Sequence, residues 1–170
     1  MWILSLIPSC HREGEVGLSQ NDQVGIDSVV SACPDIDSLQ SCLRYFERTA
    51  NELGVILAYK ELEVRYREAA RFNEAIGCHR EGLRLAMQRK DTSEVIQALN
   101  NIGTNFRRLG IMDEASNYHY RALSLCERLG DKESYKARKN RTISLSGIGN
   151  VYLTLENCEI KVTDIRTGDG

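Results

Sequence analysis

The sequence predicts an all-α fold built from stacked helical hairpins. Three observations support this class. Pro8 and Pro34 are the only prolines, so no residue after position 34 carries the side chain that most strongly breaks a helix. The chain matches itself when it is shifted by 40 residues. Within the matching segments, apolar side chains recur three and four positions apart, as on the buried side of a helix.

The internal repeat is clearest between residues 56 and 126. At the 40-residue shift, the segment Asn73-Glu74-Ala75 falls on Asp113-Glu114-Ala115, and several single residues also coincide, among them His79 with His119 and Leu83 with Leu123. A third, partial copy follows 46 residues later, where Leu145, Ile148, Gly149 and Tyr152 repeat Leu99, Ile102, Gly103 and Phe106. Residues 37–53 have the pattern of the second helix of an earlier hairpin. A repeat of this length predicts copies that stack to bury their apolar faces.

Each copy is expected to contain two helices. In the clearest copy, Ser93 can cap the first helix with its hydroxyl, and Gly110 follows its end. Met112 or Asp113 opens the second helix, which Gly130 closes. Small residues at positions such as Gly103 and Ala115 predict that the two helices approach closely, and a larger side chain there would force them apart.

The pattern of the central copy resembles a tetratricopeptide repeat. The resemblance is carried by the run Ala98-Leu99-Asn100-Asn101-Ile102-Gly103-Thr104-Asn105-Phe106, then by Gly110, Asp113-Glu114-Ala115 and Ala122-Leu123. It implies a right-handed superhelix of α-α hairpins, here with about two full repeats and two half repeats. The pattern departs from the family where Glu63 replaces a small residue and where His79 and His119 replace an aromatic one.

More narrowly, residues 53–155 are similar to the sensory repeat region of Bacteroidetes regulators that contain tetratricopeptide repeats, in truncated form. This similarity rests on residues 98–110 and on the run Gly147-Ile148-Gly149-Asn150-Val151-Tyr152. It implies a scaffold that binds a protein or peptide, as the sensory part of an envelope-linked signalling regulator. The alternative is a truncated structural remnant of a longer regulator with no independent activity.

We expect three segments: a signal-like stretch and flexible tether at 1–34, a repeat domain at 35–156, and an irregular tail at 157–170. A short apolar run leads into Ser9-Cys10, which is similar to the end of a bacterial lipoprotein signal peptide. Lipidation of Cys10 would anchor the chain to a membrane on the periplasmic side of a bacterial envelope. The alternative is a disordered N-terminal tail on a cytoplasmic protein.

The C-terminal segment lacks the apolar stripe of a second helix after Tyr152. The alternation of Ile160 and Val162 indicates a short strand or a loose tail instead. The third hairpin would then be incomplete, and its uncapped end is expected to make the chain self-associate.

The sequence offers no support for catalysis, metal binding or nucleic-acid binding. The net charge is −2, and the densest basic run spreads around more than one helix face: Lys136, Arg138, Lys139 and Arg141. The six cysteines form no CxxC pair, so we expect no metal or cofactor, and sulfurs that serve mainly as small apolar side chains. His79 and His119 are expected to pack in the core. No nucleophile motif or phosphate loop occurs, which predicts a protein that is not an enzyme.

Polar residues beside the core stripes of the first helices predict a groove for an extended peptide. Amide side chains can both donate to and accept from a peptide backbone, and arginine can pair with carboxylates. The expected groove residues are Lys60, Arg67, Gln97, Asn100, Asn101, Thr104, Arg108 and Asn150. The alternative is an ordinary solvated helix face.

Overall fold

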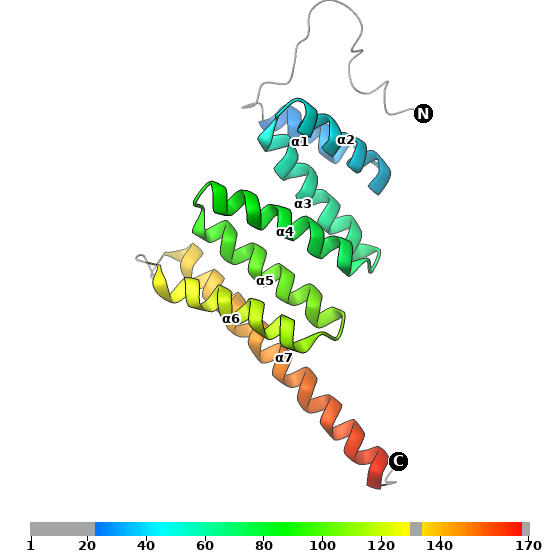
Figure 1. Ribbon diagram of the computed structural model, residues 1–170, viewed down its shortest axis with the longest axis vertical. Coiled ribbons are helices and arrows are strands. Elements are labelled where there is room, and N and C mark those ends of the chain that lie inside the picture. The colour runs from blue at the N-terminus through cyan, green and yellow to red at the C-terminus, as the bar shows by residue number, and fades with distance from the viewer. Residues whose placement is uncertain (1–22, 130–133, 168–170) are drawn as a thin grey trace, which may run out of the picture. The chain divides into compact units, whose positions relative to one another are not determined.

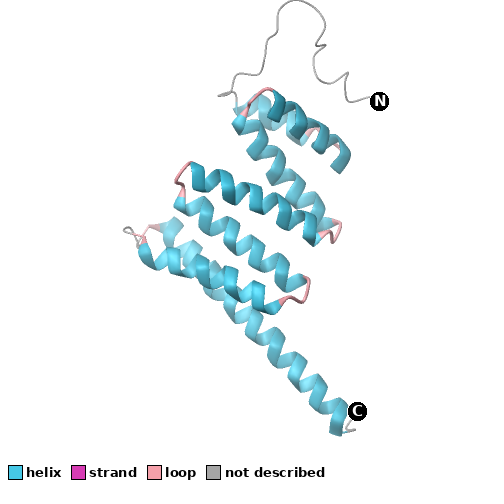
Figure 2. Cartoon of the chain, viewed as in Figure 1, coloured by secondary structure: helices cyan, strands magenta, loops and turns pink. Residues whose placement is uncertain are grey.

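The computed structural model of the protein describes residues 23–129 and 134–167, and side chains as far as residue 158. The described residues form seven α-helices and no strand, which confirms the predicted all-α class (Figure 2). The chain divides into two compact units, Met1–Arg71 and Phe72–Gly170. No helix among the described residues is long and apolar enough to cross a membrane.

The helices are labelled in Figure 1. The first unit contains α1 (Gln23–Ser31), α2 (Ile36–Arg48) and α3 (Glu52–Glu68). The second contains α4 (Phe72–Gln88), α5 (Thr92–Arg108), α6 (Met112–Arg128) and α7 (Tyr135–Thr167). The hairpin predicted for residues 56–86 therefore has one helix in each unit, and the hairpin of residues 92–128 lies wholly in the second.

Four turns recur at a fixed interval along the chain. Ala50, Ala70, Lys90 and Gly110 have positive φ angles of 51°, 55°, 55° and 79°. In each turn the next residue's N–H donates to a carbonyl five positions back, at 2.8–3.0 Å: Asn51 to Phe46, Arg71 to Tyr66, Asp91 to Ala86 and Ile111 to Phe106. This bond pattern is the Schellman ending of a helix. Because the turns recur every 20 residues, the three helices between them, α3, α4 and α5, each contain 17 residues. Helix α6 follows the last of these turns and has the same length.

In the first unit, α1 and α2 pack against α3. Ile26 of α1 and Phe46 of α2 are fully buried, and Leu62 of α3 is nearly so. The expectation of a flexible tether through residue 34 is wrong for residues 23–31, which form α1. Ile26, Val30 and Cys33 are four and three positions apart, so they form a short apolar stripe that the polar composition of this region conceals. Residues 1–22, with Cys10, lie outside the described residues.

Burial also governs the cysteines. Four of the thiols in the described residues are buried, and Cys158 is exposed: Cys33, Cys42, Cys78 and Cys126 form the buried set. Burial raises the pKa of the Cys42 thiol to about 12, so this thiol stays protonated and behaves as an apolar side chain.

In the second unit, α5 packs against α4, α6 and α7. Its core contains Ile96 and Leu99 of α5 together with Ala122 and Cys126 of α6. The predicted cap of α5 is wrong: Asp91, not Ser93, is the N-cap, and its carboxylate accepts from the Glu94 N–H at 3.1 Å. The Schellman turn ends at this residue, so the cap position is set by the preceding turn.

Helix α7 is the largest departure from expectation. It has 33 residues and continues through Thr167, where the sequence predicts a turn after residue 152 and an irregular or extended tail from 157. Gly110, which ends α5, corresponds to Glu156 at the 46-residue shift, so no glycine is present to turn the chain. The second half of α7 extends beyond α5 and α6 (Figure 1).

Candidate functional site

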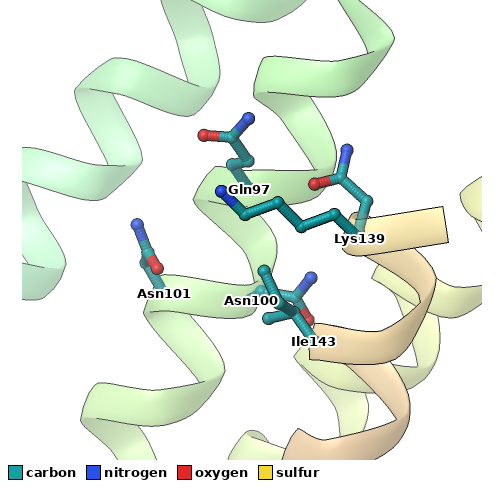
Figure 3. A pocket seen from close by; sticks show the side chains of 6 residues that line it. Gln97, Asn100, Asn101, Lys139 and Ile143 are labelled. Atoms are coloured by element: carbon teal, nitrogen blue, oxygen red, sulfur yellow. The ribbon is translucent and has the colours of Figure 1, made fainter. Parts of the chain in front are cut away.

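A small pocket lies between α5 and α7 in the second unit (Figure 3). Its volume is about 120 Å³, which suits one side chain better than a whole small-molecule ligand. Helix α5 contributes three amide residues and α7 contributes the others: Gln97, Asn100 and Asn101 face Lys139, Asn140 and Ile143.

The lining is mostly polar, and its charge is positive. None of the six residues is acidic, and Lys139 is the only charged one. Figure 3 shows the Lys139 side chain extending from α7 over the pocket, while Gln97 and Asn101 project from α5. Among the described residues, no ion pair involves Lys139. The pocket therefore offers an ammonium group and amides that can each donate and accept.

The floor of the pocket is a buried hydrogen-bond chain that joins three helices. Asn100 is 1% exposed, and its amide nitrogen donates to Ser144 Oγ of α7 at 2.9 Å. Ser144 Oγ donates in turn to the Asn140 carbonyl at 3.0 Å. The Asn100 amide oxygen lies 3.0 Å from His119 Nδ1 of α6. These bonds fix the orientation of the Asn100 amide, so its oxygen accepts and His119 Nδ1 carries the proton.

His119 occupies the junction of α5, α6 and α7 and is 1% exposed. A Cβ added to Gly147 would overlap its imidazole ring, and one added to Gly103 would lie 2.9 Å from Nε2. The same Cβ at Gly103 would lie 3.1 Å from the Ala115 carbonyl oxygen, which bears out the predicted close approach of α5 and α6. Glycines at these two positions thus admit a histidine where the repeat pattern has an aromatic residue.

Burial, with a smaller contribution from Arg107, lowers the pKa of His119. The ring is therefore neutral at pH 7, and Nε2 has no hydrogen-bond partner in the structure. An imidazolium at this position would need an acceptor for the second N–H, and Gly103 supplies none. The burial of His119 confirms that it packs in the core. No group of three or more potential metal ligands occurs among the described residues.

A second contact ties α7 to the start of α5. The Asn140 side-chain amide donates to Ser93 Oγ at 3.0 Å, and Asn140 is 2% exposed. Ser93 therefore fastens α7 to α5 and is not the residue that caps α5. Together with the Asn100–Ser144 bond, it holds the two walls of the pocket at a fixed separation.

Of the eight predicted groove residues, three line the pocket. Gln97 and Asn101 line the pocket as expected, but the placement of Asn100 off the core stripe is wrong, because its side chain is buried and bonded on both ends. Thr104 donates to the Asn100 carbonyl at 3.0 Å. Arg108 is exposed at the end of α5, with its guanidinium 5.9 Å from the Phe72 ring centroid.

The other predicted groove residues lie outside the pocket. Asn150 is exposed on α7, and its carbonyl accepts from Thr154 Oγ1 at 2.7 Å. Lys60 and Arg67 are exposed on α3 in the first unit, and Arg67 forms an ion pair with Glu63 at 3.2 Å. Glu63 is 8% exposed, so this pair places the Arg67 guanidinium beside a buried carboxylate.

Sequence reasoning missed the α7 wall of the pocket. The sequence pattern places Lys139 only in a basic run that spreads around more than one helix face, and it predicts no groove role for Asn140 or Ile143. The 46-residue shift contains the missing signal, because it places Ile143 at the position of Gln97. Equivalent positions of consecutive first helices were thus predictable as neighbours.

No family of known proteins matches this chain, and no curated protein matches it either. The candidate site accordingly rests on the geometry of the second unit alone.

Proposed function

We propose that the protein is a tetratricopeptide-type scaffold that binds an extended segment of another protein across the α5–α7 face. The pocket between α5 and α7 is the observation that carries this proposal. In a right-handed superhelix of hairpins, the first helices of successive repeats line the inner groove, and α5 and α7 hold those positions in the 40- and 46-residue pattern.

The chemistry of the pocket supports a peptide ligand. Amide groups of Gln97 and Asn101 can bond to a peptide backbone irrespective of its sequence, and the 120 Å³ volume admits one ligand side chain. Lys139 favours a side chain or terminus with negative charge. The hydrogen-bonded floor holds these groups in place before the ligand arrives, which lowers the entropy cost of binding.

A wider role as the sensory part of a bacterial envelope regulator is part of the same proposal. It rests on the resemblance of the repeat and on the signal-like run before Cys10. A scaffold of this kind would act by binding and would carry out no reaction of its own.

The proposal can be tested with a displayed library of random peptides, panned against the full chain. Peptides that bind should do so less tightly to Asn101→Ala and Lys139→Ala, by about 0.5–1.5 and 1.5–3 kcal/mol for a neutral and a charge-assisted hydrogen bond. Asn117→Ala is the matched control, because Asn117 is an exposed asparagine on α6 outside the pocket. Recovered peptides that bind all three variants as tightly as the parent would refute this site.

A further inference from the structure

Helix α7 has an apolar side that no described helix covers. The 46-residue shift equates Leu99 with Leu145 and Phe106 with Tyr152. On α5, Leu99 is 2% exposed and Phe106 stacks on Tyr118 of α6 with ring centroids 5.5 Å apart. On α7, Leu145 is 45% and Tyr152 is 58% exposed. The residues of α7 that correspond to the packing residues of α5 are therefore exposed.

We define the open face of α7 as Arg141, Leu145, Gly149, Tyr152 and Glu156. These residues follow one another at intervals of three or four, so they share one side of the helix. All five are exposed, and a Cβ at Gly149 would meet no atom within 4 Å.

The open face is separate from the other two surfaces that α7 uses. The side buried against α5 and α6 contains Ala137, Asn140, Ser144, Gly147 and Val151. Lys139 and Ile143, which line the pocket, lie on the far side of that buried stripe. Two residues of the open face contact the edge of α6: the Tyr152 and Tyr120 hydroxyls are 3.1 Å apart, and Arg141 pairs with Glu127 at 2.7 Å.

The distribution of charge along α7 distinguishes the ways in which two such helices could pair. Residues 135–149 contain four basic side chains and no acidic one, whereas residues 150–167 contain three acidic and two basic side chains. Parallel pairing of two copies would align the basic halves with each other. Antiparallel pairing aligns each basic half with the slightly acidic half of the other copy, and so removes that repulsion.

We propose that two copies of this chain dimerise by antiparallel packing of α7 on α7 through the open face. With the two-fold axis beside Gly149, Leu145 of one copy meets Tyr152 of the other, and Arg141 meets Glu156. The glycine lets the helix axes approach closely at the centre, and a two-fold interface needs only this one self-complementary surface. At 1.5 Å per residue, the 33-residue helix offers about 50 Å of length for the contact. The peptide pocket stays accessible, because it lies on a different side of α7.

Sedimentation velocity of the full chain over a range of concentrations tests the dimer. We expect a monomer–dimer equilibrium whose Kd rises about tenfold or more in Leu145→Glu and in Tyr152→Glu, since each places a charge at the centre of an apolar interface. The matched control is Asn150→Glu. Asn150 is exposed on α7 and is neither three nor four positions from any residue of the open face, so the Kd of this variant should stay within about twofold of the parent. Far-ultraviolet circular dichroism establishes that each variant keeps its helix content.

Three results would overturn the proposal. The first is a parent chain that stays monomeric at every concentration, in which case the open face serves a different partner. The second is a dimer that Tyr152→Glu leaves unchanged or that Asn150→Glu weakens equally. The third is a dimer whose affinity increases as salt is raised. Antiparallel pairing should weaken with salt, so such an increase would show that the basic halves of α7 are aligned.

Discussion

Replacing Gly147 by alanine tests how tightly α7 packs on His119. The added Cβ would overlap the imidazole ring, and the nearest atoms are His119 Cε1 and Nδ1. The ring cannot move freely, because Asn100 holds Nδ1 and Gly103 lies against Nε2. Overpacking a site of this kind typically costs about 1–3 kcal/mol of unfolding free energy.

Gly149→Ala provides the matched control, two positions along the same helix. No atom of the same chain lies within 4 Å of the added methyl group there, so at protein concentrations where the chain is monomeric only the helix preference changes, by about 0.5–1 kcal/mol in favour of alanine. Gly147→Ala receives the same gain in helix preference. The difference between the two variants, about 1–3 kcal/mol, therefore measures the clash with His119 alone.

The assay is urea denaturation followed by circular dichroism at 222 nm, with the unfolding free energy extrapolated to water. In a His119→Ala background the ring is absent, so Gly147→Ala should no longer destabilise; the two substitutions should couple by most of the clash energy. If Gly147→Ala and Gly149→Ala are equally stable in the parent background, the close contact between α6 and α7 is refuted.

Three further outcomes are expected. Gly110→Ala should destabilise by about 1 kcal/mol in urea denaturation, because its φ is +79° with open space around it, whereas Lys90→Gly should be neutral or stabilising because it relieves a φ of 55°. Burial lowers the pKa of His119, so the unfolded chain binds more protons below pH 6.5; stability should fall as pH drops from 6.5 toward 5, and this slope should flatten in His119→Gln. In bacterial cells that express the chain, labelled palmitate should enter the parent but not Cys10→Ser; equal labelling of the two, or labelling of neither, would exclude the lipid anchor.

The repeat pattern predicted the helices where their ends are marked by local chemistry. The stripe through Ile96, Leu99 and Ile102 shows the period of a helix, and all three residues are buried. The turns at Ala50, Ala70 and Lys90 carry no glycine, so no single residue reveals them. Their positions follow from the 20-residue interval before Gly110, which is half the repeat that the sequence shows.

Two errors have the same physical origin. The sequence predicts a tether where α1 forms and an irregular tail at residues 157–167, because both segments lack a long apolar stripe. A short stripe suffices for α1, which packs against α3. The second half of α7 continues because nothing interrupts it: residues 150–167 contain no glycine and no proline. An apolar stripe predicts a buried helix more reliably than the absence of glycine and proline predicts an exposed one.

Asn100 could not be assigned from sequence, because an asparagine beside a core stripe looks the same whether it faces solvent or a buried partner. Its partners, Ser144 and His119, are 44 and 19 residues away. This burial separates two kinds of variant. Asn101→Ala should weaken ligand binding and leave stability nearly unchanged, since Asn101 is exposed.

Asn100→Ala should cost more stability than Asn101→Ala, because it removes the amide that donates to Ser144 Oγ and accepts from His119 Nδ1 in a buried site. An unsatisfied buried group costs about 1–3 kcal/mol, so this variant should lose stability as well as binding. The pocket floor is thus the same set of bonds that fastens α7 to α5 and α6. A ligand that binds between α5 and α7 must then also stabilise the α7 junction, because it binds only the state in which these helices are docked. A ligand that bound in the pocket without raising the midpoint of urea denaturation would show that the pocket and the junction are independent.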